Sequence, residues 1–363
     1  MLQEPVRYRD DLEAIPDDEA DTIQALEKVF RGIVDKTHAD LGHAYRGVHA
    51  KPHALLEGRL EVRPDLDIGL AQGIFRPGRI YPAVIRMSAI PGDPISDRVS
   101  LPRGLSIKVL GVEGVRLPGS EEHVSQDFLL VTGATFSDPT LAGFLRSMRL
   151  LAGTTDRAEP AKIALSTIVQ PIEGALESVN LPSGLLQTFG GYCRTNPIGE
   201  RYYSQGAIRF GDYVGKIDLV PHSPNFRALT DQPLPPSKDH DAIRDELLAI
   251  FAEEGGSWEL RVQLCRDLDR NPVEDASVVW PEVGNPYLPL AVLTVPPQRS
   301  WSPERQTELN ERTAFSPWQG ITEHRPLGAA MRARRRVYRA IQDHRSILNG
   351  CPIREPHTLP LVD

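Results

Sequence analysis

Apolar residues recur every three or four positions in several stretches of the chain, a period that predicts amphipathic helices. These stretches cover residues 20–38, the beginning of 139–180, a short segment at 241–254 and about 328–348. One face of the second stretch carries Leu141, Phe144, Leu145, Met148 and Leu151.

Residues 49–132 have a different pattern, with short alternating or wholly apolar runs separated by Gly and Pro. Examples are LLEGRLEVR, YPAVIRMSAI, RGLSIKVLGV and DFLLVTG, and the runs FGDYVGKIDLVP and SWELRVQLCRD continue the pattern further on. Such runs are typical of antiparallel strands. We therefore predict an α+β fold, an antiparallel β-barrel with flanking helices. Residues 1–45 are predicted as a helical arm and 46–363 as one domain, helical from about 328.

Composition narrows the function classes. The 363 residues carry 41 Lys+Arg against 49 Asp+Glu, a net charge of −8, which disfavours nucleic acid as a partner. Three cysteines without a CxxC pair argue against a disulfide framework and a structural zinc site. No apolar run reaches the about 20 residues of a membrane helix, so membrane insertion is not expected. The acidic start lacks the apolar core of a signal peptide, and a cytoplasmic location is expected.

The C-terminal helix carries an unusual set of polar residues. Arg334, Tyr338, Gln342 and Arg345 are spaced by four, four and three positions, which places them on one helical face. One interpretation is a basic surface helix, or one that binds an acidic partner. The other is a tyrosine held as phenolate by Arg334, one turn before it, since a nearby positive charge favours the charged form. A phenolate can ligate ferric haem.

Polar residues at fixed spacing in the first half of the chain decide between these interpretations. The segments RGVHAKPHALLEG and PAVIRMSAIPGDPISDRVSLPRGLSIKVL, with the R-x-x-x-Y of the last helix, resemble the haem-catalase superfamily. The short chain resembles the small catalase-related peroxidase branch and is also similar to coral allene oxide synthase domains. The matching residues are Arg46, Val48, His49, Lys51, Arg86, Ser88, Pro102, Arg103, Gly104, Lys108, Trp258, Val262, Gln263, Trp280, Pro281, Pro286, Arg334, Tyr338 and Arg345.

The resemblance implies a haem b cofactor whose iron is bound by Tyr338. It makes His49 the acid/base for peroxide and Ser88 the residue that orients it, and it makes Arg334 the partner of the tyrosine. Since strand parity would place Arg46 and His49 on opposite faces, a bulge or kink at Gly47 is predicted. The implied haem contacts are Arg46, Val48, Arg86, Phe144, Arg334, Tyr338, Gln342 and Arg345.

The sequence departs from this family at two positions. The distal Asn of catalases aligns with Thr132, or less well with Val131, and the His four residues after the proximal Tyr is Gln342. A hydroxyl lacks the reach and the two donors of an amide. The replacement of the Asn therefore leaves open whether the protein disproportionates H2O2 as efficiently as catalases do. His53 could line the distal channel, but a place at the surface is expected. Neither a second metal site nor an NADPH site is expected.

Three functions follow from these residues. The first is a haem-dependent peroxidase or catalase-like oxidoreductase that acts on H2O2 or an organic hydroperoxide with an electron donor. The second is a fatty-acid hydroperoxide isomerase or lyase of the allene-oxide-synthase type, although such relatives tend to carry Thr where this chain has Val48. The third is a haem- or lipid-binding protein without turnover. A homodimer is the assembly that the resemblance implies.

Overall fold

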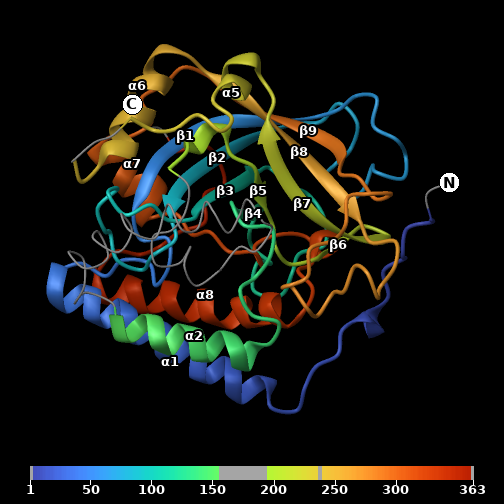
Figure 1. The fold of residues 1–363 in the computed structure, drawn as a ribbon, viewed down its shortest axis with the longest axis horizontal. Helices are drawn as coiled ribbons and strands as arrows, with labels where there is room; N and C mark the ends of the chain where they lie inside the picture. The colour runs from blue at the N-terminus through green and yellow to red at the C-terminus, as the bar shows by residue number, and fades with distance from the viewer. Residues whose placement is uncertain (1–2, 155–193, 236–238, 361–363) are drawn as a thin grey trace.

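A computed structural model describes residues 3–154, 194–235 and 239–360. Eight antiparallel strands form a barrel in the order β5-β4-β3-β2-β1-β9-β8-β7, and the pairing of β5 with β7 closes it (Figure 1). The short strand β6 (Ile208–Phe210) extends β7 as a hairpin. The barrel strands are β1 (Pro52–Val62), β2 (Ile80–Ala89), β3 (Arg103–Leu110), β4 (Ser125–Val131), β5 (Tyr202–Tyr203), β7 (Tyr213–Pro221), β8 (Gly256–Leu264) and β9 (Leu288–Val295).

Alternation along each strand divides the barrel into an apolar interior and a more polar outer face. On β2, Ile85 and Met87 join the central apolar cluster. Because side chains alternate along a strand, Arg86 and Ser88 point to the outer face, where both are nevertheless buried. Something must therefore cover this part of the barrel. The α+β barrel predicted from the sequence is confirmed.

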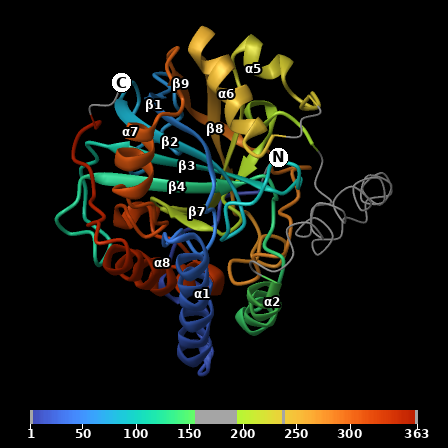
Figure 2. The ribbon, with the colours of Figure 1, turned by 90° about the vertical axis from the view of Figure 1, so that its left-hand side faces the viewer.

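Three helices lie side by side below the barrel (Figures 1 and 2). They are α1 (Glu19–Leu41), α2 (Leu141–Thr154) and α8 (Ala329–Leu348), and their apolar faces form a second core. The predicted helices at 20–38 and 328–348 are confirmed within a few residues. The predicted stretch 139–180 is helical as far as residue 154, and its remainder lies outside the described residues, as does Cys193.

The remaining helical elements are short apart from α6. α5 (Pro224–Ala228) and α6 (Ala242–Glu253) lie on the opposite side of the barrel from α8 (Figure 2). α7 (Pro303–Arg305) leads directly into η3 (Gln306–Glu311), which is a π-helix. The 3-10 turns are η1 (Asp10–Leu12), η2 (Pro197–Gly199) and η4 (Thr322–His324).

Carboxylates from distant segments fix the start of α8. Glu13 accepts a hydrogen bond from the backbone N–H of Gly328, and Glu274 accepts one from that of Ala329. The two carboxylates thereby satisfy donors that a helix N-terminus leaves free. Arg332, one turn on, forms ion pairs with Glu13, Glu19 and Glu274. The N-terminal segment therefore holds α8, and with it Tyr338, against the rest of the molecule.

Candidate functional site

His49 lies on the outer face of the barrel, against β2 and β3. Its Nδ1 is 3.1 Å from Ser88 Oγ. A Cβ atom on Gly104 would stand 2.5 Å from His49 Cε1, so the imidazole packs directly on the backbone of β3. The predicted pair of His49 and Ser88 is brought together by the fold, and only glycine leaves room for the ring at position 104.

The backbone bends at His49 itself. This residue has φ +56°, a conformation uncommon for a residue other than glycine. Its carbonyl accepts a 2.6 Å hydrogen bond from Arg86 Nη2, and its N–H donates to the carbonyl of Ile90. The predicted kink at Gly47 is therefore wrong in position. β1 starts only at Pro52, with a register shift between Pro52 and Ala54, so the parity of an extended strand does not apply to residues 46–51.

The surroundings of His49 keep its imidazole neutral. Burial is the largest cause, and the charges of Arg86, Arg334 and Arg46 act in the same direction, lowering the pKa of His49 to about 3. At neutral pH the ring is therefore unprotonated, and the lone pair of one ring nitrogen is free to form a hydrogen bond.

Tyr338 and Arg334 form a pair on α8. Arg334 Nη2 donates a 2.8 Å hydrogen bond to Tyr338 Oη, and its guanidinium lies 5.1 Å from the centre of the same ring. The other end of the guanidinium donates to Met331 Sδ at 3.5 Å. The positive charge of Arg334 also lowers the pKa of His49, after burial and the charge of Arg86.

Three arginines predicted to bind one ligand cluster beside His49. Arg86 and Arg345 are buried, and Arg46 is half-buried. Burial lowers the pKa of each guanidinium, that of Arg86 to about 9. Within the described part of the chain, Glu311 is the one carboxylate that forms an ion pair with any of them, at 2.7 Å from Arg345 Nη2. Three positive charges thus face one negative charge.

The sequence analysis missed the two residues that hold this cluster. Asn310 Oδ1 accepts hydrogen bonds from Arg46 Nη1 and Arg86 Nε, and Glu311 binds Arg345. Both residues lie on the π-helix η3, a rare form that often occurs at functional sites. No apolar period or motif in QTELNE marks it, so the sequence carried no usable signal.

The two residues aligned with the distal Asn, Thr132 and Val131, make different contacts. Thr132 follows β4, and its Oγ1 accepts a 3.1 Å hydrogen bond from the backbone N–H of Arg103. Val131 is the residue paired with Gly104, on which His49 packs. Val131, an apolar residue, therefore shares the face of the sheet on which His49 packs. We favour Val131 over Thr132 as the residue of β4 nearest His49.

Other predicted contacts lie nearby on the helical layer. Val48 and Phe144 are half-buried and pack against the second core, where Phe144 contacts Phe30 and Phe136. Gln342 is half-buried on α8, one turn after Tyr338. The structure thus keeps these three residues on the same side of the barrel as Tyr338.

His53 is not at the surface, which corrects the sequence-based expectation. It is 1% exposed, and both of its ring nitrogens lack a hydrogen-bond partner. Its Nδ1 is 3.8 Å from Asp97 Oδ1, and burial lowers its pKa to about 3. His53 is the second residue of β1 and lies at the register shift between Pro52 and Ala54, an irregularity that the sequence pattern does not indicate.

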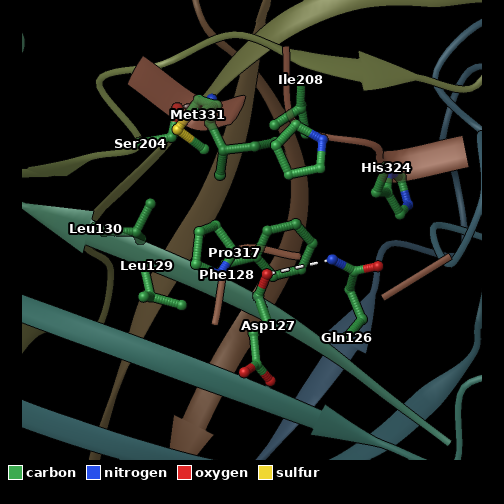
Figure 3. Close-up of a pocket in the computed structure, with 12 residues that line it drawn as sticks. Gln126, Asp127, Phe128, Leu129, Leu130, Ser204, Ile208, Pro317, His324 and Met331 are labelled. Carbon is green, nitrogen blue, oxygen red and sulfur yellow. Dashed lines mark hydrogen bonds between the residues drawn. The ribbon is translucent and has the colours of Figure 1, made fainter. Parts of the chain in front are cut away.

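A small cavity lies between the barrel and the start of α8 (Figure 3). Its volume of about 20 Å³ suffices for one water molecule. Its lining includes Gln126, Phe128, His324 and Met331. Met331 is the residue whose sulfur contacts Arg334, so the cavity adjoins the support of Tyr338 rather than His49.

Comparisons with known proteins place this architecture. No protein-family model and no curated protein matches the sequence. A fungal catalase superposes with a TM-score of 0.57 and 18% identity, over 88% of this chain and 64% of that one. Catalase A from Saccharomyces cerevisiae gives 0.57 and 17%, over 95% and 67%. A bacterial catalase gives 0.55 and 15%, over 89% and 63%.

The fold is catalase-like. This chain spans about two thirds of the length of those catalases. Throughout the described residues, no helix is both long and apolar enough to cross a bilayer. Over the same residues there is also no group of three or more His, Cys, Asp or Glu side chains placed to hold a metal ion. The contacts of His49, Tyr338 and the arginine cluster mark this region as the candidate site.

Proposed function

We propose that the protein is a haem-dependent peroxidase or catalase-like oxidoreductase that decomposes H2O2 or an organic hydroperoxide. One observation supports this most strongly: the His49–Ser88 pair on the barrel and the Arg334–Tyr338 pair on α8 stand beside one cluster of three arginines, two of them buried. The site offers a neutral imidazole on the barrel, a phenol oxygen on α8 and guanidinium groups beside them.

The residues fit haem b. Arg46, Arg86 and Arg345 against Glu311 leave two positive charges, which the two propionates of one haem would neutralise. Guanidinium groups bind carboxylates in a bidentate manner. Tyr338 Oη, which Arg334 holds by a hydrogen bond, would bind the iron. Bound haem would supply the iron chemistry of peroxide cleavage.

His49 would move the proton. With Nδ1 engaged by Ser88, Nε2 is left to accept a proton from one peroxide oxygen and to return it to the other as the O–O bond breaks. The low pKa of His49 leaves the imidazole unprotonated at neutral pH, so Nε2 has a free lone pair for this proton. Ser88 and the backbone of Gly104 fix the plane of the ring, so the proton moves along one direction.

The pairing of Val131 with Gly104 bears on the substrate. Val131 offers no donor to a bound peroxide, whereas an Asn would offer two. We therefore favour peroxidase turnover with a separate electron donor over the disproportionation of H2O2. We also propose that the protein is cytoplasmic and forms a homodimer. Light scattering of the purified protein tests the homodimer directly.

The same observation favours a second candidate. An apolar Val131 beside His49 suits a fatty-acid hydroperoxide, which an isomerase or lyase of the allene-oxide-synthase type rearranges without a reductant. Product analysis with a lipid hydroperoxide separates the two activities. Alcohol as the sole product supports the peroxidase, and an epoxide or aldehyde product supports the isomerase or lyase.

The test compares His49→Gln with His222→Gln in the full-length protein reconstituted with haemin. His222 is exposed and far from the cluster in sequence, so its replacement should change nothing. Loss of His49 should slow peroxide-dependent oxidation of a dye about 100- to 10,000-fold, with haem absorbance retained. If the unaltered protein oxidises the dye no faster than free haemin, the proposal is wrong.

A further inference from the structure

Glu311 is the most extensively bonded carboxylate beside the arginine cluster. Its Oε2 accepts a 2.7 Å hydrogen bond from Arg345 and lies 3.1 Å from His43 Nε2. Its Oε1 accepts hydrogen bonds from Asn310 Nδ2 and Gln306 Nε2, at 2.6 and 3.2 Å. Both oxygens are therefore satisfied from within the chain, and the carboxylate is held in one orientation.

Asn310 extends the influence of Glu311 to the other two arginines. Its amide nitrogen donates to Glu311, while its Oδ1 accepts from Arg46 at 2.6 Å and from Arg86 at 2.7 Å. Donation to the carboxylate polarises the amide and strengthens the acceptor at its other end. One carboxylate and one amide on adjacent residues of η3 thus hold all three guanidinium groups.

The electrostatics show the same connection. Burial alone would raise the pKa of Glu311, but the hydrogen bond with His43 and the charges of Arg345 and Arg46 bring it down to about 2. In return, Glu311 raises the pKa values of all three arginines against the effect of burial. Removal of this single charge would leave three neighbouring cations, two of them buried, without the carboxylate that offsets their mutual repulsion.

We propose that Glu311 is a built-in counter-ion that holds the three arginines in place before a dianionic ligand arrives, and that it sets the net charge of the cluster at +2. The identity of that dianion, the propionate pair of haem, rests on the proposed function. The role of Glu311 as a positioning residue rests on the protein's own contacts. A +2 cluster is matched by two carboxylates, whereas a +3 cluster would keep one charge unpaired after binding.

An electrostatic role of Glu311 and a purely structural one have different consequences for stability. If Glu311 only ties η3 to α8, its loss destabilises the haem-free and haem-bound proteins equally. If it is a counter-ion, its loss is felt most in the haem-free protein, because bound propionates then supply the missing negative charge. The destabilisation caused by loss of Glu311 should also be smaller when one of the arginines is removed.

The experiment measures thermal unfolding of the full chain without haem. Glu311→Gln should lower the midpoint by about 5 °C or more, as expected for a broken buried ion pair in a chain of this size. Glu311→Asp, which keeps the negative charge, should lower the midpoint by less. Glu308→Gln is the matched control, since Glu308 is more exposed on the same π-helix and pairs with Arg312.

The decisive comparison uses the background Arg46→Met. In this background Glu311→Gln should lower the unfolding midpoint by about half as much, since one of the three mutually repelling cations has been removed. Equal decreases in the two backgrounds would overturn the proposal. Added haemin should raise the midpoint of Glu311→Gln more than that of the unaltered protein, and an equal rise would also overturn it. If the unaltered protein binds no haem, the proposed function fails, and the haem-free comparison alone still decides the role of Glu311.

Discussion

Arg46 and Arg86 donate hydrogen bonds to the same atom, Asn310 Oδ1, at 2.6 and 2.7 Å. The two arginines come from different parts of the chain, one before β1 and the other on β2. A single acceptor therefore fixes the distance between two guanidinium groups. This shared contact defines the part of the site that would face a dicarboxylate ligand.

The shared acceptor leads to the first prediction. Asn310→Leu removes the acceptor shared by Arg46 and the buried Arg86, and each buried donor left without a partner costs about 1–3 kcal/mol. We expect a lower free energy of unfolding in urea and weaker haem binding in an absorbance titration. Thr307→Ala, on the exposed side of η3, is the control and should change neither quantity. Unchanged haem affinity in Asn310→Leu would contradict the shared-acceptor model.

The contact between His49 and Gly104 leads to the second prediction. In Gly104→Ala, the new Cβ would lie 2.5 Å from His49 Cε1 and 2.7 Å from Nδ1, so the ring must leave Ser88. Turnover of peroxide should fall roughly 10- to 100-fold, the range typical of lost orienting contacts, with haem absorbance retained. Gly32→Ala, which meets no atom within 4 Å, should behave as the unaltered protein. Full activity in Gly104→Ala would show that His49 does not need this position.

Buried histidines predict how stability depends on pH. Burial lowers the pKa of His324 to about 3, as it does for His49 and His53, whereas an unfolded histidine titrates near about 6.5. As the pH falls below 6.5, the unfolded state takes up protons that the folded state refuses until about pH 3. The contribution of these three histidines to the free energy of unfolding is therefore fully present above about pH 6.5 and is lost progressively towards pH 3.

His324 offers the cleanest test of this effect. Its Nε2 accepts a hydrogen bond from the backbone N–H of Ile74, a contact that Gln can replace. Urea unfolding of His324→Gln at pH 7.5, 6.0 and 5.0 should show a shallower loss of stability than the unaltered protein. Asp127, whose pKa burial raises to about 7, acts in the opposite direction in both proteins and cancels in the comparison. Equal slopes would contradict the assignment.

The repetitive parts of the fold could be predicted from the sequence. Alternation of Ile85 and Met87 with Arg86 and Ser88 marks a strand with one apolar face, and it also places the two polar residues on one side. The period of Arg334 and Tyr338 brings them together within a helix, since local geometry alone decides that contact. These predictions depend on neighbours in sequence, and the structure confirms them.

The contacts made between distant segments could not be predicted. Glu311 and Asn310 lie on a π-helix without apolar period, and their partners come from elements far away in the chain. The bend at His49 is a single backbone angle, which no residue pattern announces. His53 turns inward because the start of β1 is irregular. In each case tertiary packing, rather than local propensity, decides where the side chain lies.

The most direct test of the account is the absorption spectrum of Tyr338→Phe after reconstitution with haemin, beside Tyr213→Phe as a control from β7. We predict that Tyr338→Phe loses haem or shows a changed axial ligand while its circular dichroism stays the same, because Phe keeps the packing of the ring and removes only the oxygen. The control should match the unaltered protein. A ferric spectrum unchanged by loss of the Tyr338 oxygen would contradict the central claim that this oxygen binds the iron.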